Sequence, residues 1–189
     1  MIRIAVVGDI GSGKSYVAKS FRYPVFNADI EVVKLYQNNK IIFNRLKKVL
    51  SKHIYSFPIN KNEISKAILA NQLNLHKIVK IIHPEIRKKM NTFLKKNKKK
   101  KFLVLDIPLL LENKINKKGD IIIFVESKKS EIIKRLKKRK NFNLRLFKRF
   151  KNIQLPLDYK KKKSHFIIKN DFTNSSIKDS IRIILKEIL

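Results

Sequence analysis

The sequence lacks cysteine, which excludes disulfide bonds, thiolate zinc sites and a cysteine nucleophile. It also lacks any apolar run approaching the roughly 18 residues that a membrane-spanning helix needs. The chain enters an apolar stretch directly after Met1-Ile2-Arg3, which leaves no room for a signal peptide. We therefore expect a cytoplasmic protein with no membrane partner, and the length of 189 residues predicts one domain around a single core.

Acidic residues are scarce: the chain has 14 Asp and Glu against 46 Lys and Arg, and its formal net charge is +32. One interpretation is attraction to polyanions such as nucleic acid, membrane surfaces or phosphorylated metabolites. The other, which we favour, is the codon bias of an A/T-rich genome, because lysine, isoleucine and asparagine are abundant together. The lysine runs at 98–101 and 160–163 carry no interleaved aromatic residues, so we expect no specific nucleic-acid partner.

Glycine is scarce too, and three of the four glycines fall in Gly8-Asp9-Ile10-Gly11-Ser12-Gly13-Lys14-Ser15, directly after the apolar run 4–7. This octapeptide has the pattern G-x-x-x-x-G-K-[ST] of a phosphate-binding loop. Glycines let successive backbone N–H groups surround a phosphate, and the following helix adds the positive end of its dipole. Lys14 is expected to reach the β- and γ-phosphates, and the Ser15 hydroxyl to complete a Mg²⁺ shell. The pattern predicts a nucleoside triphosphate site; the alternative is a tight turn capped by Ser12 or Ser15.

Short apolar runs predict strands at 2–7, 102–105, 121–125 and 166–168, with a fifth, shorter candidate at 24–26. They are continuous rather than alternating, which is typical of a parallel sheet covered by helices on both faces. Helical patterns lie at 14–22, 30–38, 40–50, 63–72, 84–97, 128–140, 143–153 and 175–188. The alternation predicts an α/β fold, with a helical insertion at about 30–97 that is a candidate substrate-binding lobe.

Two aspartates follow predicted strands, the place where ligands bind in open parallel sheets. Asp29 is a candidate base for a hydroxyl that attacks the γ-phosphate, and its alternative role is the N-cap of the helix at 30–38. Asp106 is a candidate ligand of Mg²⁺, directly or through water. A cap or turn role stays open for Asp106 because Pro108 follows closely.

Basic residues supply further candidates for phosphate binding. Pro84 is expected at the first position of a helix, which places His83 at the N-cap and Arg87 on the same face. Such a terminus can receive a phosphate, although a capping histidine explains the pattern equally well. A later helical region carries arginines that are expected either to close over the triphosphate as part of a lid or to be solvated: Arg135, Arg139, Arg145 and Arg149.

Taken together, six segments resemble the dephospho-CoA kinase family, in the family's order and across nearly the whole chain. Residues 7–15 resemble its G-G-I-G-S-G-K-S loop, and residues 24–29 resemble its D-A-D segment. Residues 82–87 match H-P-x-[IV]-R, and residues 105–112 match D-x-P-L-L-[FV]-E. Residues 154–157 and 166–170 resemble Q-[ML]-P and V-I-D-N. The loop alone identifies only a P-loop protein, whereas the other motifs in this order are much more specific.

The resemblance implies a P-loop kinase fold: a parallel five-stranded sheet flanked by helices, with a helical substrate-binding insertion and a lid. It places the core at about 1–28, 102–139 and 164–189, the substrate lobe at about 29–97 and the lid at about 140–163. The implied enzyme uses ATP and Mg²⁺ to phosphorylate the 3′-hydroxyl of dephospho-CoA, the last step of coenzyme A synthesis. We expect a monomer, with an oligomer left open.

The resemblance also implies roles for single residues. Asp29 takes the general-base position, and the other catalytic candidates are Lys14, Arg139 and Arg145. Substrate binding is assigned to Asp29, His83, Arg87 and Asp106, and metal binding to Ser15 and Asp106. The ATP contacts are assigned to Gly11, Ser12, Gly13, Lys14, Ser15, Tyr16 and Asn170.

Several residues depart from the family's pattern. Asp9 stands where the loop usually has a second glycine, so its charge must point away from the phosphates or weaken ATP binding. Asn27 replaces the first acid of D-A-D, which leaves Asp29 as the base. The remaining departures are Tyr16 after the loop serine, Phe150 at the lid-arginine position beside Arg149, and Lys169 before Asn170. Activity is still expected, with reduced efficiency.

Three other functions stay open. One is a different small-molecule P-loop kinase, such as a nucleoside or nucleotide kinase. Another is a basic nucleic-acid-binding P-loop ATPase, which the net charge of +32 suggests. The third is a degenerate relative that binds nucleotide without turnover, which Asp9 and Asn27 make conceivable.

Overall fold

The computed structural model describes residues 1–139 and 142–189, and it divides into two compact units. The first unit comprises Met1–Asn27, Asn97–Phe142 and Ile153–Leu189, and the second comprises Ala28–Lys96 and Asn143–Asn152. The elements of the first unit are β1 (Ile2–Gly8), α1 (Lys14–Ser20), β2 (Val25–Asn27), β3 (Phe102–Asp106), β4 (Ile121–Glu126), α6 (Lys129–Lys137), α8 (Leu157–Lys162), β5 (Phe166–Lys169) and α9 (Asn174–Glu187). Those of the second are α2 (Ala28–Asn38), α3 (Lys40–Val49), α4 (Lys61–Ala70), α5 (Gln72–Lys96) and α7 (Leu144–Lys151).

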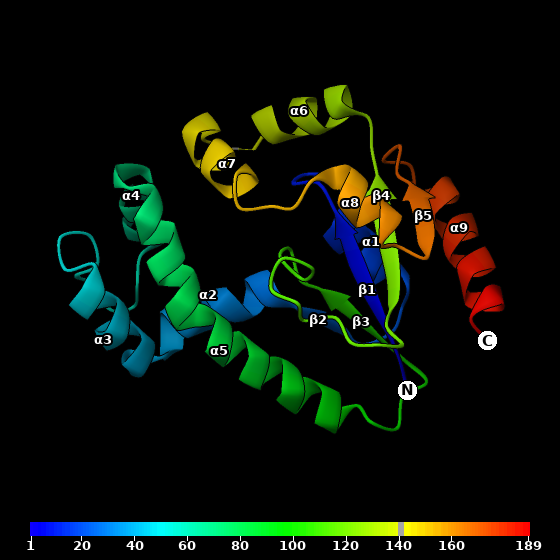
Figure 1. Cartoon of the computed structure of the whole chain (residues 1–189), viewed down its shortest axis with the longest axis horizontal. Helices are drawn as coiled ribbons and strands as arrows, with labels where there is room; N and C mark the ends of the chain where they lie inside the picture. Colours follow the sequence, from blue (N-terminus) through cyan, green and yellow to red (C-terminus); the bar gives the residue numbers. More distant parts are fainter. Residues whose placement is uncertain (140–141) are drawn as a thin grey trace. The chain divides into compact units, whose positions relative to one another are not determined.

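The first unit is built on a parallel sheet with the strand order β2-β3-β1-β4-β5 (Figure 1). Its registers align the carboxyl ends of the strands: Asn27 pairs with Asp106, Val6 with Asp106, and Gly8 with Val125. These pairings confirm the predicted five-stranded parallel sheet in the described part of the chain. They also bring the end of β1, where the glycine-rich loop begins, beside the end of β3.

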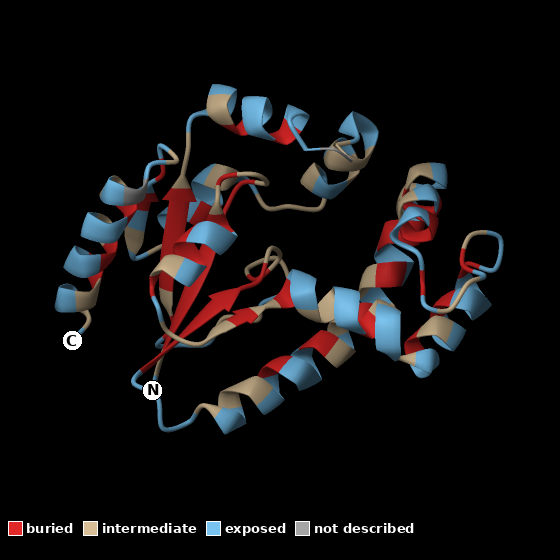
Figure 2. Cartoon of the chain, turned by 180° about the vertical axis from the view of Figure 1, so that it is seen from behind, coloured by how far each residue is buried: buried red, intermediate tan, exposed pale blue. Residues whose placement is uncertain are grey.

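The strands are buried on both faces, and alternate residues form the core on the face that packs against α1 and α9. Ile4 and Val6 of β1, together with Val104 and Ile123 of the neighbouring strands, are completely buried against α1 and α9. The apolar stripe predicted for the last helix is part of this cluster, through Ile177, Ile181 and Ile184. Figure 2 shows the strands as the most continuous buried region. Each side chain of this kind contributes about 1.5–3 kcal/mol when it leaves water, so the sheet is a rigid support for the loops at its edge.

The second unit is helical, and α5 contacts α2, α3 and α4, while α4 contacts α7. The prediction that a helix begins at Pro84 is wrong, because α5 runs unbroken from Gln72 to Lys96 with Pro84 inside it. His83 is therefore an interior helix residue and not an N-cap. An interior proline costs roughly 3 kcal/mol. The buried residues Ile78, Ile82 and Ile86 continue at helical spacing through this point, and their burial offsets that cost.

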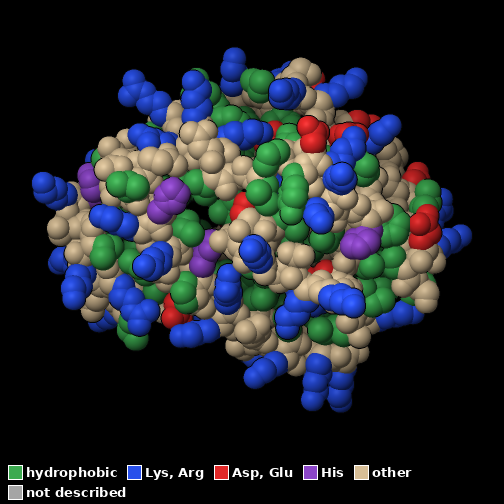
Figure 3. All heavy atoms as spheres, in the orientation of Figure 1, with side chains coloured by type: hydrophobic (Ala, Val, Ile, Leu, Met, Phe, Trp, Pro, Cys, Tyr) green, Lys and Arg blue, Asp and Glu red, His purple; other side chains and the backbone are tan. Residues whose placement is uncertain are grey.

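Other boundaries differ by a few residues, and α8 within the lysine-rich stretch was not predicted as a helix. The first residues of the predicted lid, 140 and 141, lie outside the described residues. The following segment Asn143–Asn152 belongs to the second unit, and the chain returns to the first unit at Ile153. Among the described residues, no helix combines the length and the apolar character that a membrane crossing requires. On the face drawn in Figure 3, lysine and arginine side chains are scattered and not gathered in one strip.

Candidate active site

The glycine-rich loop joins β1 to α1, and its backbone conformation requires glycine. Gly11 and Gly13 have φ angles of 86° and 89°, in the left-handed region that side chains disfavour. A Cβ atom added at Gly13 would lie 2.2 Å from Nδ2 of Asn170. The loop therefore depends on the absence of a side chain at Gly13, because Asn170 occupies the space that a Cβ atom would need.

Lys14 is the first residue of α1 and is only 9% exposed. Its ammonium group donates to the carbonyl oxygens of Asp9 at 2.7 Å and Gly8 at 3.3 Å. Two backbone carbonyls thus hold the positive charge against the start of the loop. The contact of Lys14 with the phosphates of a nucleotide stays a prediction.

Asn170 holds the loop from the end of β5, the edge strand of the sheet. It follows β5, is 3% exposed, and donates from Nδ2 to the carbonyl of Ser12 at 2.8 Å. The same carbonyl accepts from the hydroxyl of Ser127 at 3.0 Å. The Ser12 hydroxyl is completely buried and has no hydrogen-bond partner among the described residues. Asn170 was predicted as an ATP contact near the adenine, and that role stays a prediction; the structure shows that its side chain contacts the backbone of Ser12 in the loop.

Asp106 ends β3 and is 2% exposed, which makes it a buried carboxylate at the edge that carries the loop. Its Oδ2 accepts from Nδ2 of Asn27, the last residue of β2, at 2.5 Å. Asp106 is therefore the final residue of a strand and has neither a cap nor a turn role. Ser15 and Tyr16, by contrast, are exposed residues in the first turn of α1.

A stacked pair lies beside the loop; the sequence analysis named Arg135 as a candidate phosphate ligand but missed its partner, Phe172. The guanidinium of Arg135 lies 4.2 Å from the centre of the Phe172 ring, and the backbone N–H of Phe172 donates to Asn170 Oδ1 at 2.8 Å. Phe172 adopts a φ of 67°, which is unusual for an aromatic residue. Its ring would come within 3.5 Å of a Cβ atom at Gly13. The available signal was the position of Phe172 two residues after Asn170, but no pattern marked it.

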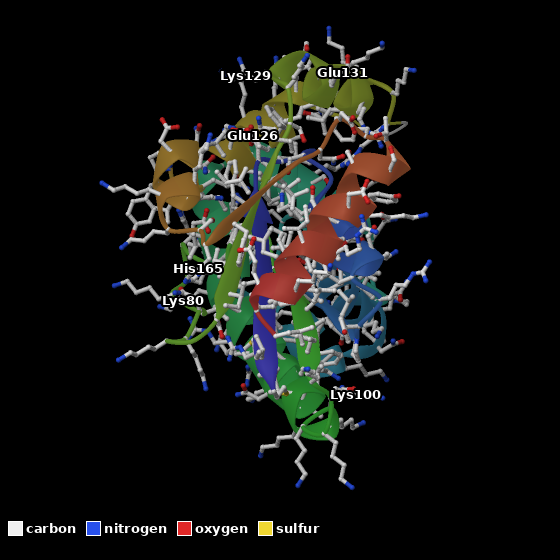
Figure 4. The ribbon with its side chains drawn as sticks, turned by 90° about the vertical axis from the view of Figure 1, so that its right-hand side faces the viewer. Lys80, Lys100, Glu126, Lys129, Glu131 and His165 are labelled. Atoms are coloured by element: carbon white, nitrogen blue, oxygen red, sulfur yellow. The ribbon has the colours of Figure 1, made fainter. Side chains whose placement is uncertain are left out.

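Asp9, the unusual acid of the loop, is 7% exposed, and its Oδ1 accepts from the N–H of Ile10 at 2.7 Å. It lines a hollow of about 180 Å³ with the end of β4 and the start of α8, including Val125 and Leu157. Figure 4 shows Glu126 and Lys129 at this end of the sheet and His165 toward the other.

The other predicted site residues are distributed over both units. Arg139 follows α6 in the first unit and is exposed. Asp29, His83, Arg87 and Arg145 belong to the second unit. Asp29 lies one residue inside α2, so it is not the N-cap of that helix. Arg149 donates to Oε1 of Gln72 at 3.0 Å within the second unit, which ties α7 to the start of α5.

The residues that are present fit a nucleotide and its metal ion. In the described part of the chain, no group of three His, Cys, Asp or Glu side chains could hold a metal by itself. Mg²⁺ in nucleotide sites is commonly held by one or two protein ligands together with phosphate oxygens and water, which Ser15 and Asp106 can supply. A loop that follows the first strand of a parallel sheet and encloses a lysine, beside an acid on the adjacent strand, is how P-loop proteins hold nucleoside triphosphates. The first unit accordingly has a P-loop kinase fold.

Residues 2–177 match the model of the dephospho-CoA kinase family, and the chain therefore belongs to that family. It is 33% identical over 187 residues to the dephospho-CoA kinase of Wolbachia pipientis wMel, an alignment covering 94% of this chain and 95% of the relative. It is 31% identical over 193 residues to the dephospho-CoA kinase of a Bacillus cereus strain, covering 97% and 96%.

Solved structures confirm the fold. TT1252 from Thermus thermophilus superposes with a TM-score of 0.79 at 22% identity, covering 100% of this chain and 98% of that one. The dephospho-CoA kinase from Campylobacter jejuni superposes with a TM-score of 0.61, also at 22% identity, with the same coverage.

Proposed function

We propose that this protein transfers the terminal phosphoryl group of ATP to the 3′-hydroxyl of dephospho-CoA and releases coenzyme A and ADP. The observation that carries the proposal is the loop with Lys14 folded into it and Asp106 at the adjacent strand end, in a chain of the dephospho-CoA kinase family. These groups bind and neutralise phosphate oxygens. The family supplies the identity of the acceptor.

The triphosphate end of ATP is assigned to residues 11–16 of the loop and α1. Backbone N–H groups of this segment bind the phosphates, and Lys14 moves its ammonium group from the loop carbonyls to the β- and γ-phosphates. Ser15 and Asp106 would hold Mg²⁺, which supplies neutralisation of the charge on the phosphoryl group in transfer. The base is assigned to the side of Asn170, where the Phe172 ring and the Arg135 guanidinium offer stacking faces.

The acceptor is assigned to residues of the second unit. Asp29 takes the proton of the ribose 3′-hydroxyl as its oxygen bonds to the γ-phosphorus, while the bond to the β,γ-bridging oxygen breaks and ADP departs. His83 and Arg87 are assigned to binding of dephospho-CoA. Arg139 and Arg145 are assigned to the transferring phosphoryl group, where a guanidinium offsets developing negative charge.

We further propose that the protein acts as a monomer in the cytoplasm, where its proposed donor ATP is held. Sedimentation at working concentration tests the monomer, because a second copy would double the mass.

The deciding experiment measures ADP release from MgATP with dephospho-CoA, and with a panel of nucleosides and nucleotides, at physiological salt. Turnover with dephospho-CoA alone, giving a product of coenzyme A mass, is the expected result. Turnover with a nucleotide instead would show that the protein is a kinase with a different acceptor. ATP binding without any turnover would contradict the proposal and indicate loss of catalysis. A parallel assay with RNA tests the polyanion alternative, since binding through charge alone falls steeply with salt.

A further inference from the structure

We propose that Asn27 is a positioning residue for Asp106 and that it limits the paired ends of β2 and β3 to a single carboxylate, so that a divalent ion binds here only together with a nucleotide. The inference rests on the proposed function in one respect, the assignment of Asp106 to the metal ion. It explains how residue 27 of this chain sets the charge beside Asp106 and the orientation of the Asp106 carboxylate.

The geometry places the two side chains in direct contact. Asn27 and Asp106 are register partners at the carboxyl ends of the parallel strands β2 and β3. Asn27 donates from Nδ2 to Asp106 Oδ2 at 2.5 Å. Asp106 is 2% exposed, so solvent cannot supply this hydrogen bond. The amide therefore holds Oδ2, one of the two oxygens of the carboxylate.

The identity of residue 27 decides the charge at this edge. A buried carboxylate is stable when polar groups satisfy it, and an amide does so without adding charge. An aspartate at position 27, the residue type that the resembling D-A-D segment carries first, would set a second negative charge at hydrogen-bond distance from Asp106. Two carboxylates this close repel strongly in a poorly solvated site unless a cation lies between them. Such a pair would attract a divalent ion without any nucleotide, and the Asn27–Asp106 pair does so far less.

No nearby acid of the loop replaces the missing charge. Asp9 is also buried, but its carboxylate accepts from the N–H of Ile10 and lines the hollow beside Val125 and Leu157. That hollow adjoins β4, whereas Asn27 and Asp106 lie on β2 and β3. Asp9 is therefore not one of the two register partners, and the charge at the Asn27–Asp106 pair depends on residue 27 itself.

The test titrates Mn²⁺ into nucleotide-free protein and measures its affinity by electron paramagnetic resonance of the free ion. We compare the wild-type protein with Asn27→Asp, a change of nearly equal volume, and with the double variant Asn27→Asp/Asp106→Asn. Asn27→Asp should bind Mn²⁺ at least about tenfold more tightly than wild type, and the double variant should lose this gain. Equal affinity of Asn27→Asp and wild type would overturn the inference about charge.

The positioning role is tested by Asn27→Ala. In this variant, the factor by which Mg²⁺ strengthens ATP binding should fall at least about threefold, because Asp106 loses the donor that orients it. A general loss of folding would weaken ATP binding with and without Mg²⁺ alike, and an unchanged Mg²⁺ factor would refute positioning. If wild-type protein fails to phosphorylate dephospho-CoA, the proposed function fails, yet both binding measurements still decide the role of Asn27.

Discussion

The ammonium group of Lys160 lies 2.6 Å from Oε1 of Glu112, and the two side chains are only 1% and 9% exposed. The same carboxylate oxygen accepts from the backbone N–H of Leu155 at 3.0 Å. Glu112 therefore connects the segment after β3 to the point where the chain re-enters the first unit and begins α8. This buried ion pair lies inside a run of lysines that otherwise resembles a solvated stretch.

Lys160→Met should destabilise the protein by about 3–5 kcal/mol, because it leaves the buried Glu112 carboxylate without its counter-charge. The adjacent Lys161→Met is the matched control, since Lys161 is 44% exposed in its pair with Glu126 and such pairs contribute about 0–1 kcal/mol. Urea unfolding at neutral pH measures both. Equal changes in the free energy of unfolding for the two variants would show that the buried pair adds nothing.

Gly13→Ala should weaken ATP binding by at least about tenfold, equal to about 1.4 kcal/mol, since the new Cβ atom would collide with Asn170 and displace the loop. Gly119→Ala is a close control for backbone strain: its φ is 90°, against 89° at Gly13, but nothing lies within 4 Å of its Cβ position. Isothermal titration calorimetry should find normal ATP affinity in Gly119→Ala. If both variants bind ATP equally well, the close approach of Asn170 is not what requires glycine.

Phe172→Ala should weaken ATP binding by about 5–150-fold, the range expected for loss of one stacked base at about 1–3 kcal/mol. Inhibition by inorganic tripolyphosphate, which has no base, should stay unchanged in the same variant. If binding of ATP and of tripolyphosphate weakened equally, the Phe172 ring would maintain the shape of the loop and would not stack on the base.

Asp29→Asn should lower kcat by about 10²–10⁴ while ATP affinity stays nearly constant, as expected for loss of a general base. Glu31→Gln is the control, because Glu31 lies in the first turn of the same helix and pairs with Lys34. Single-turnover phosphoryl transfer to dephospho-CoA measures the effect. Normal turnover by Asp29→Asn would show that Asp29 is not the general base.

Glu63→Gln should destabilise the second unit in a pH-dependent way. Burial alone would raise the pKa of Glu63. Hydrogen bonds from the Ser56 hydroxyl and from the N–H groups of Tyr55 and Ser56 act in the opposite direction, as does the charge of Lys66. Together these groups outweigh the effect of burial and lower the pKa of Glu63 below its ordinary value of 4.5. A lowered folded-state pKa means that the carboxylate contributes stability above pH 4.5 and loses it as pH falls through the folded-state pKa. The difference from wild type should be about 1–3 kcal/mol at pH 7 and should shrink in acid. Urea midpoints across this range measure it, and a pH-independent difference would contradict the assignment.

Much of the fold was predictable because its signals are local. The loop at residues 8–15 is a contiguous pattern, the strands are continuous apolar runs, and the stripe of α9 repeats at helical spacing. Chain order alone also indicated that helices lie between β2 and β3. These features depend on residues that are neighbours in the sequence, so the five-stranded sheet and the phosphate site could be predicted without coordinates.

The tertiary structure decided what depends on distant partners. Asn27 meets Asp106 across 79 positions because β2 and β3 are neighbours in the sheet, and Arg135 meets Phe172 through the packing around the loop. No local pattern distinguishes Lys160, which is buried, from the three exposed lysines that follow it. Pro84 signalled a helix start, but a stripe of buried isoleucines extends on both sides of it. The sequence by itself determined the class of the protein and its phosphate loop, since both are local patterns. Packing, which sums contacts over the whole unit, determined which polar groups are buried, paired and oriented at the site.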